Sequence, residues 1–268
     1  MSLTRPALVV LLLSLVLSAP VSAAEKQPLV LQAAQSQMQA ILTSLDDRMK
    51  EACGQLSAAQ LDSSRTARVL RWLRTKEPQV IVASTVSPQG VMVLVEPGEY
   101  SRFEGSDISQ QPQVQSMLSK HQPVASQLFQ TVEGYWAVDI ERPIWGPKQD
   151  FRGAVSATVH PAPLAKQVLD GITAAQGLRF YLLQLDGTVL FSNRLEEIGL
   201  NLKKTGLYKE LPEVRQAVDR ILAEPQGSLD GRHFLGKQPE DALPRRNHWT
   251  SLELHGVQWR LGFAEPIL

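Results

Sequence analysis

The sequence predicts a mixed α/β protein of the α+β kind, in which a long N-terminal helix precedes two tandem modules. Each module is expected to be a mainly antiparallel sheet flanked by helices. Three observations predict this: an apolar stripe at helical spacing over 38–56, short β-rich runs bounded by Pro or Gly from residue 80 onward, and a repeated order of elements. Helix, hairpin, polar excursion and returning strands occur twice, so the second half repeats the first on a smaller scale.

The charge balance argues against partners that are charged polymers. The 268 residues contain 27 Lys and Arg and 27 Asp and Glu, which gives a formal net charge of zero. A nucleic-acid-binding surface or a polybasic membrane surface would need an excess of Lys and Arg. We therefore expect no nucleic-acid partner.

Residues 1–24 are expected to be a secretory signal peptide. Arg5 precedes the apolar run 7–18, and Pro20 leads into the small residues Val-Ser-Ala-Ala at 21–24, where cleavage is expected. The alternative is an uncleaved N-terminal anchor, since the segment approaches the roughly 20 residues that span a bilayer. Either way the rest of the chain is expected outside the cytoplasm, in the periplasm or secreted.

Residues 25–78 are expected to form the N-terminal helices. The spacing of the apolar residues predicts a first helix whose stripe packs on the chain's own sheet or pairs with the same stripe of a second copy. Ser57 is expected to be the N-cap of a second helix over 58–78, which Pro78 ends. The stripe consists of Met38, Leu42, Leu45, Met49, Ala52 and Leu56.

The chain contains a single cysteine, Cys53. No internal disulfide can form, even in an oxidising compartment. The thiol is either an ordinary unpaired one on a helix or a cross-link between two copies.

Residues 79–165 are expected to form the first module. The runs 80–95, 134–144 and 152–160 are rich in Val, Ile, Tyr and Trp and predict strands of one sheet. The polar segment 96–130 leaves this sheet and returns to it, and such excursions are where binding residues tend to lie. We expect it to cover a small-molecule pocket.

Alternation along the strands suggests which residues face that pocket. In the last strand of the first module, Val155, Ala157 and Val159 share one face, and small polar residues share the other. In the strand before it, Asp139 faces away from Val138 and Ile140. The candidate ligand-binding residues are Tyr100, Arg102, Ser126, Tyr135, Asp139 and Ser156. The alternative is that the tyrosines are packing residues, that Asp139 is a solvated strand carboxylate and that Arg102 pairs with Glu104 or Asp107.

Residues 166–268 are expected to form the second module. A helix over 161–177 leads into a strand, an Asp-Gly turn and a second strand over 179–192, which is a strong hairpin signal. A helix over 214–227 follows, and the remaining strands are expected at 233–236, 248–254 and 257–264.

This order of pieces resembles the double Cache domains, which are PAS-like extracellular sensor modules of bacterial chemoreceptors and sensor kinases. The resemblance covers roughly residues 28–268. Its carriers are the long entry helix, the segments 87–109, 120–130, 141–145 and 151–159, and LDGTVLFSNRLEEIGLNL at 185–202. In the family the hairpin turn carries an Asp-x-x-Gly or Asp-Gly element, and a Gly followed by Asp-Leu-Ser or Asn-Leu opens the excursion. The corresponding residues here are Gly90, Gly105-Ser106-Asp107-Ile108-Ser109 and Gly199-Leu200-Asn201-Leu202.

The resemblance implies binding without chemistry, with a small ligand held between the sheet and the excursion of the first module. Family members that bind amino acids carry an Arg-x-Trp-Tyr run after this element. Here Gln111, Gln113 and Val114 stand at those positions, so the bidentate Arg for an α-carboxylate is missing. Arg102 or Arg142 would have to replace it if the ligand is a carboxylate.

No catalytic arrangement is expected. The sequence contains no G-x-S-x-G, H-E-x-x-H or glycine-rich phosphate loop, and its five histidines lack metal-ligand spacing. No cofactor or metal is therefore expected. A hydrolase would have to use Ser126 with His121, the nearest nucleophile and base.

The resemblance also suggests partners. Family members usually sit between two membrane helices and drive a cytoplasmic domain, whereas this sequence ends at Leu268 without one. We expect a periplasmic ligand-binding module that signals through a membrane sensor kinase or chemoreceptor. The alternative is an assembly protein that forms a homodimer through its N-terminal helix.

Overall fold

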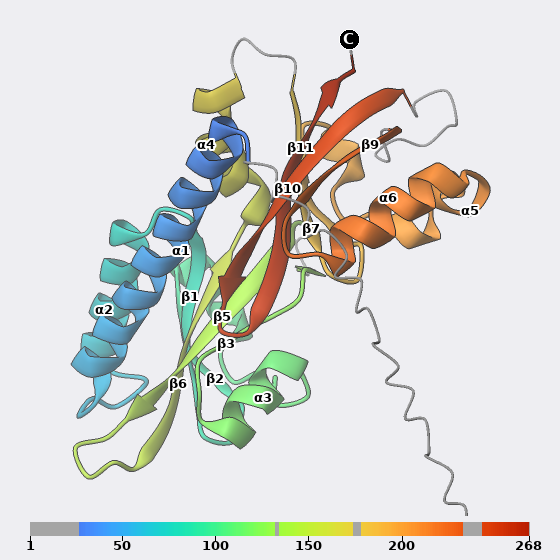
Figure 1. The fold of residues 1–268 in the computed structure, drawn as a ribbon. Coiled ribbons are helices and arrows are strands. Elements are labelled where there is room, and N and C mark those ends of the chain that lie inside the picture. Colours follow the sequence, from blue (N-terminus) through green and yellow to red (C-terminus); the bar gives the residue numbers. More distant parts are fainter. Residues whose placement is uncertain (1–26, 132–133, 174–177, 233–242, 268) are drawn as a thin grey trace, which may run out of the picture.

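A computed structural model describes residues 27–131, 134–173, 178–232 and 243–267. It contains two antiparallel sheets, with the long helix α1 running along both (Figure 1). This confirms the predicted fold class. The expected signal peptide at 1–24 lies outside the described residues.

Helix α1 (Leu29–Leu56) buries its apolar stripe against the chain's own sheets. Five members of the stripe are buried and Leu42 is partly buried. They share one core with residues of the first sheet, such as Val155, and of the second, such as Leu252. The stripe is thus covered within the chain, which is the first of the two expected arrangements.

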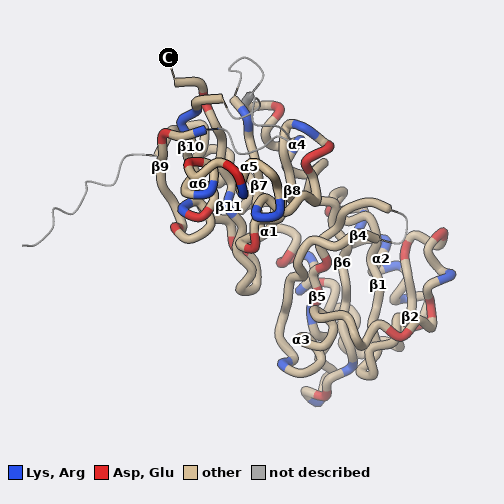
Figure 2. The backbone as a smooth tube through the Cα atoms, turned by 90° about the vertical axis from the view of Figure 1, so that its right-hand side faces the viewer, with Lys and Arg blue, Asp and Glu red and all other residues tan. Residues whose placement is uncertain are grey.

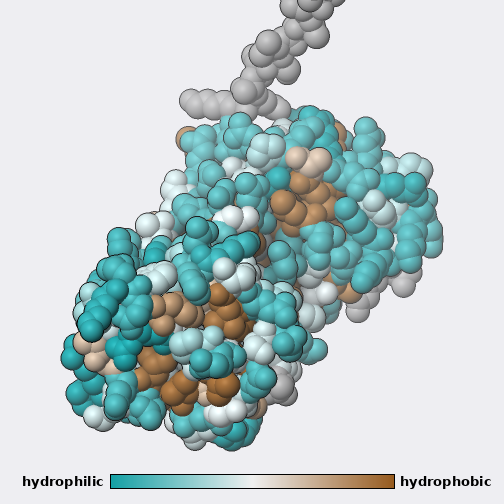
Figure 3. All heavy atoms as spheres, turned by 90° about the horizontal axis from the view of Figure 1, so that it is seen from below, coloured by the Kyte–Doolittle hydropathy of each residue, from teal (hydrophilic) through white to brown (hydrophobic). Residues whose placement is uncertain are grey.

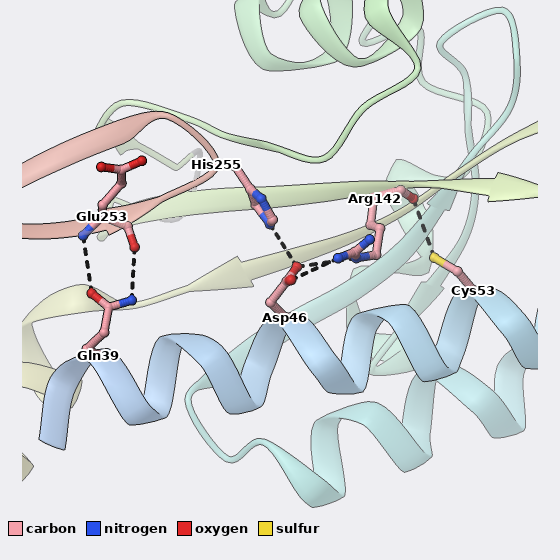
Figure 4. Close-up of polar contacts among 6 residues, drawn as sticks. All are labelled: Gln39, Asp46, Cys53, Arg142, Glu253 and His255. Carbon is pink, nitrogen blue, oxygen red and sulfur yellow. Dashed lines mark hydrogen bonds and ion pairs between the residues drawn. The ribbon is translucent and has the colours of Figure 1, made fainter. Parts of the chain in front are cut away.

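Two glutamines of α1 continue the hydrogen bonding of a strand. The strand β9 (Gly227–Arg232) pairs with β10 (Pro244–Leu254) only as far as Trp249. Beyond it, Gln35 Nε2 donates to Ser251 O at 2.9 Å and Gln39 Nε2 to Glu253 O at 3.0 Å (the Gln39 pair in Figure 4). Four residues of helix rise about 6 Å, close to the two-residue repeat of a strand, so helix and strand match in register.

The second helix starts later than predicted. Helix α2 (Ser64–Lys76) has Ser63 as its N-cap, with Ser63 Oγ accepting from Thr66 N. The prediction that Ser57 is the N-cap was wrong. Ser57 instead follows the end of α1, and its hydroxyl donates to Trp145 O at 2.7 Å.

The first sheet has the order β2-β1-β6-β5-β3, with β4 also paired to β5. Its strands are β1 (Val80–Val86), β2 (Met92–Glu96), β3 (Val124–Ala125), β4 (Phe129–Gln130), β5 (Trp136–Trp145) and β6 (Phe151–Val159). The predicted excursion 96–130 contains the 3₁₀ helix η1 (Gly98–Phe103), helix α3 (Pro112–Lys120) and the short strands β3 and β4. One face of β6 packs in the core with α1, as the alternation predicts.

The second sheet repeats this topology. Helix α4 (Pro161–Thr173) leads into β7 (Arg179–Gln184) and β8 (Val189–Ser192), and β11 (Val257–Pro266) ends the fold. Between them lie η2 (Leu195–Glu197), η3 (Leu202–Lys204), α5 (Gly206–Glu210) and α6 (Pro212–Ala223). The order β8-β7-β11-β10-β9 matches the first sheet strand for strand. The strand expected at 233–236 lies outside the described residues, and the third strand of this sheet is β9.

The same backbone hydrogen bonds occur after both hairpins. In the first module, Gly105 N donates to Met92 O and Ile108 N to Gly90 O. In the second, Gly199 N donates to Val189 O and Leu202 N to Gly187 O, at the same two donor–acceptor distances and with the same spacing between the two donors and between the two acceptors. The glycine and Asp/Asn elements that the sequence singles out thus close the same turn twice.

Basic and acidic residues are both spread over the two halves of the backbone, in keeping with zero net charge (Figure 2). Seen from below, apolar residues form separate patches bordered by hydrophilic ones (Figure 3). Within the part of the chain that the structure describes, no helix is long and apolar enough to cross a membrane.

Candidate functional site

A cavity of about 330 Å³ lies between the first sheet and the 96–130 segment. Strands β1, β2, β5 and β6 form its floor, and η1, β4 and the chain around Ile108 cover it. Aromatic side chains supply much of its wall, and hydroxyl and amide groups supply the polar part. The lining residues are Val82, Ser84, Met92, Val95, Tyr100, Phe103, Ser106, Ile108, Gln111, Phe129, Gln130, Thr131, Tyr135, Asp139, Ser156 and Thr158.

Asp139 is the sole charged side chain among the described residues that line this cavity. The side chain lies on β5 opposite Thr158, whose hydroxyl donates to Asp139 Oδ1 at 2.8 Å. Burial raises the pKa of Asp139, and hydrogen bonds from Thr158, Ser156 and Gln113 act in the opposite direction by stabilising the carboxylate. The cavity therefore offers a positioned acceptor and no lining cation.

Glu141 lies two residues further along β5, on the same face as Asp139. Its side chain is fully buried, and neither carboxyl oxygen has a hydrogen-bond partner among the described residues. Across the sheet it faces Ser156 on one side and Val124 on the other. Burial, and then repulsion from Asp139, raise the pKa of Glu141 to about 9, so the carboxyl is neutral at pH 7.

The structure brings four of the six predicted site residues to this cavity. Tyr100, Tyr135, Asp139 and Ser156 all line it. Tyr135 also stacks on His160, with ring centroids 5.8 Å apart. The prediction that these residues bind a ligand stays a prediction, now with a shared cavity behind it.

Ser126 and Arg102 lie elsewhere. Ser126 Oγ accepts from Asp139 N at 2.8 Å and donates to Gln127 O at 2.8 Å, so the hydroxyl fixes the backbone of β5 at Asp139. Arg102 is exposed and does not line the cavity. Its guanidinium lies 4.8 Å from the ring centroid of Phe103, which does line the cavity. Arg102 is therefore placed to reach only a ligand that extends out of the cavity.

Asp46, Arg142 and His255 form a polar joint between α1 and the two sheets (Figure 4). Arg142 is held in this joint and is not available to the cavity. Its guanidinium binds both carboxylate oxygens of Asp46 on α1, at 3.2 and 2.8 Å. His255, in the turn between β10 and β11, lies 2.7 Å from Asp46 Oδ1. Burial acts to raise the pKa of Asp46, but the hydrogen bonds from His255 and Arg142 outweigh it and lower this pKa to about 2.

The family's Arg-x-Trp-Tyr positions contribute amides instead. Gln111 lines the cavity, and Gln113 is buried, donating to Gln111 Oε1 at 2.8 Å. A neutral amide pair can orient a polar ligand but cannot neutralise a carboxylate. The position that would hold a carboxylate in an amino-acid sensor is thus uncharged here.

Two other hollows lack comparable chemistry. An open groove of about 590 Å³ runs between α3, the chain at 122–129 and the turn at His255–Val257. A cavity of about 50 Å³, lined by apolar side chains such as Leu42, Leu164 and Trp259, lies between α1, α4 and the two sheets. The groove contains no buried unpaired polar group among its described lining residues, and the described lining of the cavity contains one, the indole Nε1 of Trp259.

The chemistry of the site gives no support for a hydrolase or a metal centre. The Ser126 hydroxyl hydrogen is directed to a backbone carbonyl, and the ring of His121 stacks on Phe151 at 4.1 Å. Among the described residues no group of three or more His, Cys, Asp or Glu side chains could hold a metal ion.

Residues 40–161 match the family model for the sensor domain of histidine kinases, guanylate cyclases and chemotaxis proteins (HK/GC/Chemotaxis protein-like, sensor domain). The match includes most of α1 and the whole first sheet with its cavity. The two modules have the double Cache, PAS-like fold.

Solved structures support the same assignment over both modules. An extracellular ligand binding receptor from Desulfohalobium retbaense is 27% identical, with a TM-score of 0.75 over 89% of this chain. The chain spans only 40% of that receptor's length. None of the curated protein sequences matches the chain.

Two chemoreceptor domains share the double Cache fold at lower identity. The periplasmic sensory domain of the Campylobacter jejuni chemoreceptor Tlp1 is 14% identical, with a TM-score of 0.67 over 88% of this chain and 92% of the other. The ligand-binding domain of the Pseudomonas aeruginosa amino acid chemoreceptor PctC, in complex with GABA, is 14% identical, with a TM-score of 0.66 over 88% and 96%. At this identity they show the fold.

Alternation along the strands predicts the residues on the sheet side of the cavity, but not those of the 96–130 segment that cover it. Asp139 and Ser156 follow from alternation along β5 and β6, and Thr158 lies on the face that this alternation made polar. Phe103 and Phe129 were missed because their positions depend on how the 96–130 segment folds back. Strand alternation puts Glu141 on the same face as Asp139, but nothing in the sequence signals that both its oxygens lack partners among the described residues.

Proposed function

We propose that this double Cache chain is a periplasmic or extracellular sensor domain that binds a small, positively charged organic ligand without transforming it. The ligand lies in the cavity between the first sheet and the 96–130 segment. One observation carries the proposal: the described lining of this cavity combines aromatic walls with a single charged group, the carboxylate of Asp139.

The charge of the lining sets the ligand class. A cation at Asp139 gains a charge-assisted hydrogen bond and contact with the faces of Tyr100, Phe103 and Tyr135. An anion would be buried beside a carboxylate without a lining Lys or Arg to compensate it. A ligand with both charges, as GABA has, would need Arg102 at the mouth of the cavity for its carboxylate.

A thermal-shift screen of amines, amino acids, organic acids and nucleobases at pH 8 tests this function. A ligand present at 100 times its Kd stabilises the folded protein by about 2.7 kcal/mol, and so raises the melting temperature by several degrees. We expect Asp139→Asn and Tyr100→Ala to remove the shift and Asp47→Asn, an exposed change on α1, to keep it. If no compound of any class moves the midpoint, the sensor function loses its support.

Arg102→Ala separates the two ligand types. For a simple amine the variant should bind as the unchanged protein does. For a ligand that also carries a carboxylate, we expect the affinity to fall by about tenfold or more, since a charge-assisted contact contributes about 1.5–3 kcal/mol. Isothermal titration with the strongest compound of the screen measures both cases.

The module boundaries, the cellular location and the partners are proposed on the same basis. We propose N-terminal helices over 25–78, a first Cache module over 79–165 and a second over 166–268. The first module is the ligand-binding one.

Cleavage of residues 1–24 would release the chain to the periplasm. The N-terminal sequence of the purified periplasmic protein tests this cleavage, and an intact Met1 in the membrane fraction would favour an anchor. A membrane chemoreceptor or sensor kinase is the proposed partner, because the matching sensor-domain model is that of kinases and chemotaxis proteins and similar solved domains come from chemoreceptors.

A homodimer through α1 is the weaker proposal. The apolar stripe that would drive it is already packed on the chain's own sheets. Sedimentation of the purified domain with and without ligand measures the oligomeric state directly.

A further inference from the structure

The buried carboxyl of Glu141 is the polar group that the fold leaves least explained. It is fully buried, and both its oxygens lack partners among the described residues. Buried polar groups nearly always have hydrogen-bond partners, because an unpaired one costs about 1–3 kcal/mol. A glutamine at position 141 would have nearly the same size and would also lack partners, but it could not ionise. What a carboxyl adds at this position is therefore its ability to lose a proton.

The position of Glu141 links it to the cavity. Asp139 lies on the same face of β5, and Ser156, directly across from Glu141 on β6, lines the cavity and bonds to Asp139. The two carboxyls are close enough for the charge of Asp139 to oppose ionisation of Glu141. Asp139 accepts a hydrogen bond from the Thr158 hydroxyl, whereas Glu141 accepts none from the described residues, so Asp139 is the one of the pair that holds a negative charge more easily.

The surroundings of Glu141 supply no other charge. The neighbours on β3 and β6 are Val124 and Ser156, and the part of α3 above this region presents Val114 and Met117 in an apolar cluster. Arg142, the next residue, binds Asp46 on the other side of the sheet. Among the described residues, Asp139 is thus the one charged group that acts on Glu141.

We propose that Asp139 and Glu141 form a proton-linked cation site, in which a cationic ligand entering beside Asp139 displaces one proton from the pair to solvent. This inference rests on the proposed function of the cavity and adds how its charge responds to occupancy. In the empty domain the pair holds an extra proton. The positive charge of the ligand takes over the role of that proton, since it offsets the repulsion between two carboxylates.

The consequence is a domain whose response depends on ligand and pH together. Release of one proton on binding makes the affinity rise by up to about tenfold per pH unit while the pair is still protonated. The same concentration of cation is then sensed strongly at alkaline pH and weakly at acidic pH.

Isothermal titration with ethylamine, putrescine and choline tests the linkage. Choline carries a permanent charge, so its own titration cannot imitate the effect. The titrations are made at pH 6, 7 and 8, and at pH 8 in phosphate and in Tris, whose different ionisation enthalpies report the number of protons released. Glu141→Gln removes the proposed proton, and Glu197→Gln removes the buried carboxyl of the second module as a matched control.

We expect the unchanged protein and Glu197→Gln to bind at least one probe with release of close to one proton and an affinity that rises about 10- to 100-fold from pH 6 to pH 8. Glu141→Gln should bind with little release and an affinity constant to within about twofold. Binding without proton release, or equal release by Glu141→Gln, overturns the inference and leaves the ligand site standing. If none of the probes binds at pH 8 while neutral or anionic compounds do, the inference fails and the cavity remains a ligand site. If nothing binds at all, the proposed function fails with it.

Discussion

The joint formed by Asp46, Arg142 and His255 should make a large and pH-dependent contribution to stability. Asp46→Asn keeps the size of the side chain and removes its charge. The carboxylate connects α1 to β5 of the first sheet and to the β10–β11 turn of the second, so the change weakens contacts between all three. Asp47→Asn, at the exposed next position of the same helix, is the matched control.

The pKa of Asp46 gives the magnitude. The hydrogen bonds from His255 and Arg142 lower it from 3.8 to about 2 despite burial. One pKa unit corresponds to about 1.4 kcal/mol, so the charged form contributes roughly 2 kcal/mol to the free energy of unfolding. Because the pKa is lowered in the folded state, this contribution is fully present above pH 3.8 and is lost as the pH falls through 2.

Urea denaturation at pH 7 and at pH 2.5 measures it. At pH 7 we expect Asp46→Asn to be destabilised by about 2 kcal/mol and Asp47→Asn by less than about 0.5 kcal/mol. At pH 2.5 the difference between Asp46→Asn and the unchanged protein should have narrowed. Equal effects of the two variants at pH 7, or a difference that does not change with pH, would show that the ion pair does not hold the joint.

Three further predictions test other parts of the structure. The stability of Glu141→Gln relative to the unchanged protein should rise by about 1.4 kcal/mol per pH unit between pH 6 and 8, because the carboxyl of Glu141 releases its proton near pH 4.5 in the unfolded chain and near pH 9 in the folded one. A stability difference between the two proteins that is the same at pH 6 and pH 8 would show that the carboxyl is already ionised. Gln39→Ala should cost about 1 kcal/mol in the same assay, since it removes the hydrogen bonds of the Gln39 amide to Glu253 O and Glu253 N, whereas loss of the Gln55 amide, whose hydrogen bond to Glu51 stays within α1, should have little effect; equal losses would refute the strand-like role of the glutamine. Cys53 should not react with a thiol reagent at pH 8 until the protein unfolds, because burial raises its pKa to about 12, and a disulfide-linked dimer on a non-reducing gel would contradict this.

The face of the site was predictable where strand alternation operates. Side chains alternate between the two sides of a sheet, so Val155 and Ser156 could be assigned to opposite faces from sequence alone. The same rule placed Asp139 beside the cavity. It could not place Arg102, because the path of η1 over the sheet depends on tertiary contacts rather than on a local pattern.

The start of the second helix shows a limit of local signals. Ser57 and Ser63 are both plausible N-caps by residue type, and the choice depends on partners distant in sequence. The hydroxyl of Ser57 finds Trp145 O, and that of Ser63 finds Thr66 N. A tertiary contact thus decided a feature that appears local.

The sequence by itself determined the helix, the two hairpins, the repeat of modules and the polar face of the first sheet, because periodicity and turn chemistry act over a few residues. Tertiary structure decided which carboxyls are partnered. Asp46 and Glu141 are both acids beside apolar residues in the sequence, yet one meets an arginine and a histidine and the other meets no partner in the described chain. Only the fold decides this difference, because the groups that set the charge of each carboxyl come from strands, helices and turns up to 209 positions away in the sequence.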